Sequence, residues 1–170
     1  MKYKLLILSL LLVGCANPST SPTQRMAVSA PPSANSPALP VGKVMAFIVQ
    51  GDVQRKDTDG TVRALTRNDV LQQGTTIISG TNGNAVLVFS NGFSVKIPPN
   101  AEFEIVKFLQ APFDEKTLGS FLRLSADPSK SITEIYVHSG QVLFDVQKLN
   151  KAAGSTFVLN TPAGRADLRD

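Results

Sequence analysis

The chain from residue 41 onward is divided by turn signals into short apolar runs, and this spacing restricts it to an all-β fold. Runs rich in β-branched and aromatic residues alternate with turns rich in Gly, Asn and Asp, a pattern typical of β-sandwiches. No long window of the sequence shows the 3.6-residue periodicity of an amphipathic helix. The sequence therefore predicts an all-β domain over residues 43–170, an antiparallel β-sandwich or compact β-roll of short, hairpin-connected strands.

Turn residues locate the expected hairpins. Asn91-Gly92 and Asn82-Gly83 are the strongest signals, because Asn and Gly tolerate the positive φ angles of a type I′ turn. Segments 57–60, 139–140 and 161–164 mark three further hairpin turns. The strands predicted around the turns are 43–50, 52–55, 61–65, 74–79, 84–89, 93–97, 103–108, 133–137, 141–146, 157–160 and 165–168.

Residues 111–130 form the least regular part of the domain, and we interpret them as an insertion with at most one strand, at 120–124. Elsewhere, alternation predicts which side chains face the core, since successive strand residues point to opposite faces. Two strands show this alternation, with inward side chains at Val142, Phe144 and Val146 in one and at Phe93, Val95 and Ile97 in the other; Asp145 and Gln147 point outward.

Residues 1–14 and the cysteine that follows them resemble a bacterial lipoprotein signal, with Leu12-Val13-Gly14-Cys15 as its lipobox. Two lysines precede an apolar run over residues 5–13, which is shorter than the roughly 20 residues of a membrane-spanning helix. We expect cleavage between Gly14 and Cys15, and attachment of a diacylglycerol to the Cys15 thiol. Each buried methylene adds about 0.8 kcal/mol of membrane affinity. An ordinary signal peptide with a chance cysteine, or an uncleaved anchor, is the alternative.

Residues 15–42 read as a flexible linker between this anchor and the domain. They are rich in Pro, Ser and Ala, and Arg25 is their only charged side chain. Such a segment buries too little apolar surface to become ordered and predicts an extended tether. Ala16 follows the lipobox cysteine, where an Asp favours retention in the inner membrane. We therefore expect an outer-membrane lipoprotein that faces the periplasm.

Charge and composition exclude several classes of partner. Without Lys2 and Lys4, the 17 basic side chains fall to 15 against 13 acidic ones. No arginine-rich block or basic stripe remains, so no nucleic-acid partner is expected. Cys15 is the only cysteine, so its acylation leaves none for a disulfide. The fold must therefore rest on its hydrophobic core.

The motifs of catalysis and of cofactor binding are missing from the sequence. His138 is the only histidine, and its place beside a predicted turn suits a surface residue better than a catalyst. No Gly-x-Ser-x-Gly elbow or phosphate-binding loop occurs. The turn at 57–60 lacks the later bidentate Glu of a calcium loop. We expect a protein without enzymatic activity, metal or cofactor, apart from the lipid on Cys15.

The order of the segments resembles the FecR domain family over about residues 44–170. The resemblance rests on Gly51-Asp52-Val53-Gln54 and on segments 74–79, 81–89, 91–92, 95–100, 137–142 and 157–166. It implies a periplasmic β module for interaction or sensing. The best-known members pass a signal from an outer-membrane receptor to a cytoplasmic sigma factor through a transmembrane helix. This chain has no such helix before the domain, so we do not expect contact with a sigma factor.

The resemblance also predicts a free strand edge at the C-terminal end. The family continues with further strands beyond the position of Arg169, and Asp170 stands where Gly is usual. A missing strand leaves unpaired backbone groups on a sheet edge, which favours pairing with another chain.

Three functions fit these observations. The first is a lipid-anchored, non-enzymatic module that binds an envelope protein or a cell-wall glycan, with residues 111–130 as the first place to look for the site. The second is a component of cell-surface signalling that senses the state of a receptor. The third is a glycan-acting enzyme, which needs two acids in a cleft; Asp114-Glu115 and Asp127 are the candidates for such a pair.

Overall fold

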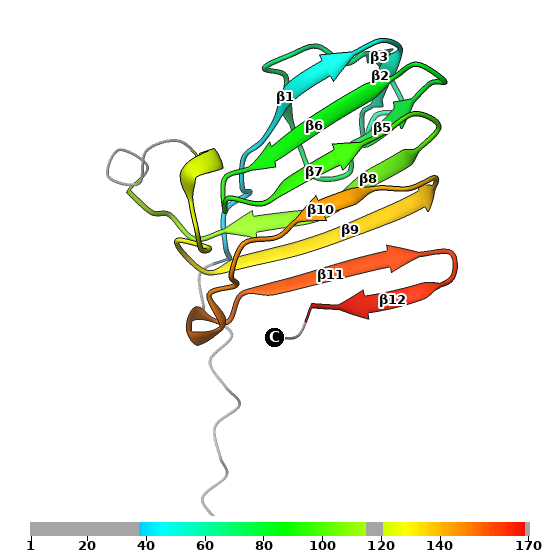
Figure 1. The fold of residues 1–170 in the computed structure, drawn as a ribbon. Coiled ribbons are helices and arrows are strands. Elements are labelled where there is room, and N and C mark those ends of the chain that lie inside the picture. Colours follow the sequence, from blue (N-terminus) through cyan, green and yellow to red (C-terminus); the bar gives the residue numbers. More distant parts are fainter. Residues whose placement is uncertain (1–37, 115–120, 169–170) are drawn as a thin grey trace, which may run out of the picture. The chain divides into compact units, whose positions relative to one another are not determined.

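A computed structural model describes residues 38–114 and 121–168, which fold into two packed β-sheets (Figure 1). The strands are β1 (Val44–Gln50), β2 (Val53–Lys56), β3 (Val62–Ala64), β4 (Val70–Leu71), β5 (Thr76–Ser79), β6 (Asn84–Phe89), β7 (Ser94–Ile97), β8 (Glu102–Gln110), β9 (Ser131–Ser139), β10 (Leu143–Asp145), β11 (Thr156–Thr161) and β12 (Gly164–Asp167). Two short 3₁₀ helices are η1 (Phe121–Arg123) and η2 (Lys151–Ala153). The predicted all-β sandwich is confirmed.

The two sheets differ in size. The larger has seven strands in the order β12-β11-β9-β8-β5-β2-β3, and the smaller has five in the order β10-β7-β6-β1-β4. Residues 40–42 continue along the larger sheet, where the amides of Gly42 and Gln110 donate to the carbonyls of Phe108 and Pro40. Among the described residues, no helix is long and apolar enough to cross a membrane.

The core lies between the sheets and is built from the inward faces of their central strands. The predicted inward residues Phe93, Val95 and Ile97 are at most 2% exposed. Phe89 and Phe108 meet edge to face with ring centroids 5.1 Å apart. Burying each such side chain stabilises the fold by roughly 1.5–3 kcal/mol, so the core holds the sheets together without a disulfide.

Three predicted hairpins are confirmed: β2–β3, β6–β7 and β11–β12 pair as antiparallel neighbours. The type I′ turns predicted at the two Asn-Gly pairs are wrong, because neither Asn has a positive φ. Residues 90–92 instead form a three-residue connection in which only Gly92 has a positive φ, of 90°. The Asn91 side chain is fully buried and donates to the hydroxyls of Ser131 and Thr133. A side-chain anchor therefore replaces the expected turn geometry.

The predicted hairpin across residues 139–140 is wrong. β9 lies in the larger sheet, whereas β10 pairs with β7 in the smaller one. Both edges of β9 are already occupied, by β8 and, in parallel, by β11. The chain crosses between the sheets at Gly140, whose φ is +79° and where a Cβ would lie 2.5 Å from the Asn100 carbonyl oxygen. A parallel pair requires such a long crossover, and β10 is part of it.

The strand predicted at 120–124 is also wrong, since η1 occupies residues 121–123. Leu124 beyond it is 8% exposed, and the amide of Ala111 donates to the Lys130 carbonyl at 2.8 Å. The described ends of the insertion are thus attached to the sandwich. β4, a two-residue strand next to β1, was not predicted, because two residues are too short for an alternation signal.

Candidate functional site

The residues predicted to carry the lipid anchor, Gly14 and Cys15, lie outside the described residues, as does the linker up to residue 37. The described part of the chain offers four places with unusual chemistry. These are a groove beside β12, a polar pair on the outer face of the larger sheet, a charged network at β2–β3, and a buried carboxylate in the insertion.

The groove lies where the sandwich opens between β10 and the β11–β12 hairpin. It has a volume of about 490 Å³ and is lined by Phe144, Asp145, Val146, Phe157, Leu159, Ala166, Asp167 and Leu168. The Phe144 ring lies 6.0 Å from that of Phe157 and 6.3 Å from that of Phe103. The groove is therefore an outward extension of the aromatic core, and apolar side chains make up most of its lining.

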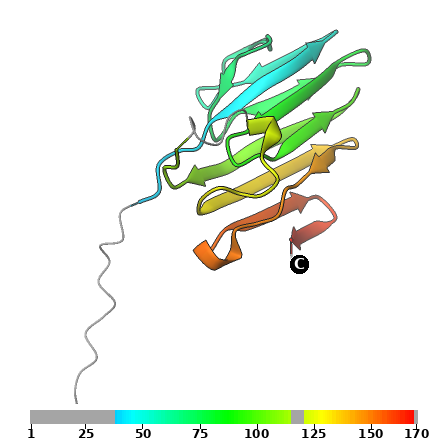
Figure 2. The ribbon, with the colours of Figure 1, turned by 60° about the vertical axis from the view of Figure 1, so that its left-hand side comes forward.

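Strand β12 is the last strand of the larger sheet (Figures 1 and 2). Its residues Ala166 and Asp167 line one side of the groove. All four of its residues are exposed, and Leu168 just beyond it is 41% exposed. In the described ranges, no strand pairs with its outer edge. Exposed apolar side chains beside an unpaired strand edge are typical of places where another chain binds.

His138 lies near the end of β9, on the outer face of the larger sheet. Its Nε2 is 2.8 Å from the Glu104 carboxylate, and its ring is stacked 4.3 Å from the ring of Tyr136. On the same face the Asn160 amide donates to Glu134 at 2.9 Å. Each of these polar side chains is thus satisfied by a neighbour. This is the surface role that the sequence predicts for His138.

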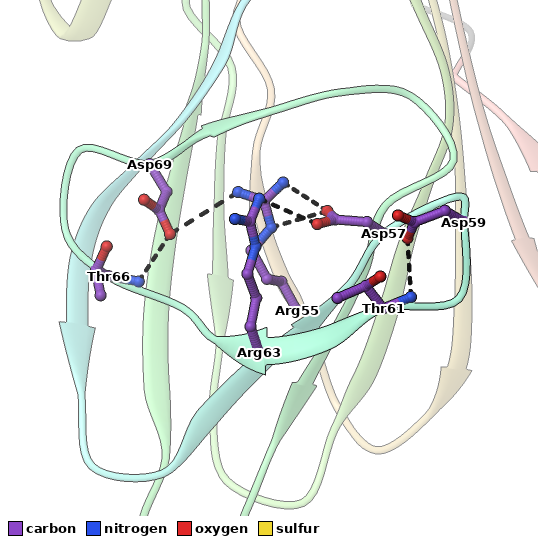
Figure 3. Close-up of polar contacts among 7 residues, drawn as sticks. All are labelled: Arg55, Asp57, Asp59, Thr61, Arg63, Thr66 and Asp69. Carbon is purple, nitrogen blue, oxygen red and sulfur yellow. Dashed lines mark hydrogen bonds and ion pairs between the residues drawn. The ribbon is translucent and has the colours of Figure 1, made fainter.

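A charged network joins the β2–β3 hairpin to the segment that follows it (Figure 3). The Arg55 side chain is 8% exposed; its Nη2 is 2.5 Å from Asp57 Oδ1, and its Nη1 is 3.8 Å from Asp69 Oδ2. Arg63 reaches the other oxygen of Asp57 at 3.1 Å. The guanidinium therefore ties the hairpin to the start of β4 and acts as a structural clamp.

Two carboxyl groups of this region have altered acidity. Partial burial acts to raise the pKa of Asp69, but hydrogen bonds from Thr66 and the nearby Arg55 and Arg63 outweigh it and hold the pKa below its ordinary value. The pKa of Asp59 is lowered chiefly by the hydrogen bond from the backbone amide of Thr61. Both are stabilised as anions, which suits a structural role and not a proton donor.

Asp127 is the buried carboxylate of the insertion, at 4% exposure. Its Oδ2 accepts a hydrogen bond from Ser131 at 2.6 Å, and its Oδ1 has no hydrogen-bond partner among the described residues. It borders a cavity of about 380 Å³ formed mainly by residues 148–152. No group of three metal-ligating side chains exists in the described ranges. Glu115, one of the acids considered for a catalytic pair, lies outside those ranges.

The groove is the place that reasoning from the sequence missed. Alternation correctly predicts that Phe144 and Val146 face inward, where they pack against the core. The wrong pairing of β9 with β10, however, hid the fact that β10 is an edge strand. The insertion, the first place predicted for a site, is fixed to the sandwich by buried contacts at Leu124 and Asp127.

Comparisons with known proteins show no family for this chain. No protein-family model matches it, and no curated protein matches it. Among solved structures, a "cell surface anchoring domain" is similar over 39% of this chain and 86% of its own length, at 24% identity and a TM-score of 0.35.

Proposed function

We propose that this chain is a lipid-anchored, extracytoplasmic FecR-like β module that binds a protein partner in the bacterial envelope and catalyses no reaction. The anchor rests on the lipobox at Gly14-Cys15 and the FecR likeness on the segment order in the sequence. The binding role rests on the groove between β10 and β12.

The groove is the observation that carries the proposal. Its lining includes Phe144, Val146, Phe157, Leu159 and Leu168, and large apolar side chains at an opening of the core mark sites where proteins dock. A cell-wall glycan presents many hydroxyl groups that need hydrogen-bonding partners, whereas Asp145 and Asp167 are, among the described residues, the only polar side chains that line the groove. The exposed backbone edge of β12 offers an extended peptide the pairing that β-augmentation uses. These features favour a protein partner over a glycan.

The anchor is tested by metabolic labelling with a radioactive fatty acid. The wild-type chain should incorporate label and remain with the membrane fraction. Cys15→Ser should lose both, because the thiol that carries the diacylglycerol is gone. Equal labelling of the two chains would contradict the anchor and leave the groove proposal untouched.

The binding site is tested by photo-crosslinking in intact envelopes. A photoreactive amino acid replaces Leu168, which is exposed and lines the groove. A matched control carries it at Lys56, an exposed residue at the other end of the same sheet. The Leu168 position should give a discrete crosslinked protein in at least about tenfold excess, the ratio that 1.4 kcal/mol of preferential binding produces. Equal yields at both positions would contradict a binding role of the groove.

A further inference from the structure

In the described part of the chain, no strand pairs with the backbone groups on the outer edge of β12. The amide of Leu168 donates to the Phe157 carbonyl at 3.0 Å, and Ala166 is paired with Leu159. In an antiparallel pair the hydrogen-bonding residues alternate along the strand. The backbone groups of Ala166 and Leu168 therefore face β11, and those of Arg165 and Asp167 face outward.

The charged side chains of β12 can pair with the same side chains of a second copy. Arg165 and Asp167 lie on one face of β12, where their side chains are 3.1 Å apart. If a second β12 approaches antiparallel with Ala166 opposite Ala166, each Arg165 comes to lie opposite the Asp167 of the other copy. Opposite charges directly across an antiparallel pair are favourable. In this register the outward backbone groups of both strands also meet each other.

The opposite face of β12 fits the same register. Leu168 of one copy comes to lie beside Gly164 of the other, on the side that faces the groove. A Cβ added at Gly164 would meet no atom within 4 Å, so space exists for a large side chain. Leu168 lines the groove of its own copy and is 41% exposed. The pairing thus covers an exposed leucine with no steric conflict at the facing position.

We propose that β12 is a self-pairing edge, at which two copies of this chain join their larger sheets through antiparallel β12 strands centred on Ala166. This inference rests on the proposed interaction role of the groove and of β12, which lines one side of it, and names a second copy as the partner that binds there. The contact is isologous and therefore closes as a two-fold dimer. A four-residue edge is smaller than a standard protein interface, so association is weak and depends on concentration.

The other edge of the same sheet does not share this complementarity. On β3, pairing with a second copy centred on Arg63 places two arginines opposite each other, and like charges in that position are destabilising. Arg63 is also engaged with Asp57 at 3.1 Å. Of the two edges of the larger sheet, β12 is therefore the one whose charged side chains complement those of a second copy.

The register is tested by disulfide formation between two copies in intact cells. At the centre of the proposed pair, two Ala166 positions are non-hydrogen-bonded neighbours with Cα atoms about 4.5 Å apart, within the range that a disulfide spans. Ala166→Cys should therefore give a disulfide-linked dimer on a non-reducing gel. Val62→Cys is the matched control, because Val62 is an exposed residue on β3, the opposite edge of the same sheet. The wild-type chain reports any background from Cys15.

The charge pairing is tested by mixing variants that carry Ala166→Cys. Arg165→Asp alone and Asp167→Arg alone should each lose most of the dimer, because like charges face each other. Co-expression of the two should restore a mixed dimer, since acids on one chain then face arginines on the other. Mixing leaves the contacts within each chain unchanged, so recovery reports only pairing between chains.

Equal crosslinking of Ala166→Cys and Val62→Cys, or no recovery on mixing, would overturn the self-pairing proposal. If the self-pairing tests fail but photo-crosslinking at Leu168 captures a different protein, the proposed function stands, and that protein is the partner that binds at the groove. If neither experiment separates β12 from its control, both proposals fail.

Discussion

The two ends of the seven-stranded sheet show how one fold can close one side of its core and leave the other open. At the β3 end, the segment from β3 to β4 crosses between the sheets and is hydrogen-bonded to both: Leu65 donates to Val53, and Asn68 donates to Ala46. At the other end, the described residues place no strand beyond β12 or beyond β10, and a groove of about 490 Å³ remains between these two edge strands. The first end contributes to the stability of the fold, and the second is where we propose that a partner binds.

The same contrast holds for their charges. Arg55 at the closed end is 8% exposed and contacts two carboxylates, whereas Arg165 at the open end is 60% exposed and contacts one. Removing one partner of a buried ion pair leaves an uncompensated charge, while exposed pairs contribute little. Equivalent substitutions at the two ends should therefore have different consequences.

The largest difference is expected for leucine truncation. Leu71→Ala at the closed end should lower the free energy of unfolding by about 3 kcal/mol, because Leu71 is 1% exposed and its removal leaves a cavity. Leu159→Ala in the groove should cost only about 1 kcal/mol, because its side chain is half-buried. Urea denaturation of the two variants measures both values. Equal losses would show that the groove is packed like the closed end.

The arginines provide the next comparison. Arg55→Met should lower the free energy of unfolding by about 2 kcal/mol, since it leaves Asp57 and Asp69 without the guanidinium; their partial exposure reduces the penalty of a fully buried pair. Arg165→Met, the matched control, should change it by less than about 0.5 kcal/mol. Thermal or urea unfolding of both variants measures the two changes in the free energy of unfolding. An unchanged free energy of unfolding in Arg55→Met would contradict the structural role given to Arg55.

Acid should weaken the closed end. The pKa of Asp69 is lowered in the folded chain, so its contribution is present above the unfolded pKa of about 3.9 and is lost as pH falls through the folded pKa. Asp69→Asn should make the loss of stability between neutral pH and pH 3 smaller, by less than about 1 kcal/mol because the side chain is 30% exposed. Urea midpoints at the two pH values test this. An unchanged pH dependence would contradict the role given to Asp69.

Local pattern was enough to predict most of the strands and the inward face of β7, because alternation and turn residues act within a few positions. The β9–β10 connection was predicted wrongly, since nothing near Gly140 reveals that both edges of β9 are already paired. The clamp at Arg55 depends on Asp69, fourteen positions away. The groove depends on two strands of different sheets ending side by side. Such features arise from tertiary pairing, which a short sequence window does not contain.

Residue-resolved amide hydrogen exchange tests most directly whether β12 pairs with a second copy while β3 does not. Exchange is compared between dilute and concentrated protein. Exchange at Arg165 and Asp167 should slow as concentration rises, because their outward amides become paired on β12. Exchange at Val62 and Ala64, the outward amides of β3 by the same alternation, should stay constant. Unchanged exchange at both edges, or protection on β3 instead, would contradict the account.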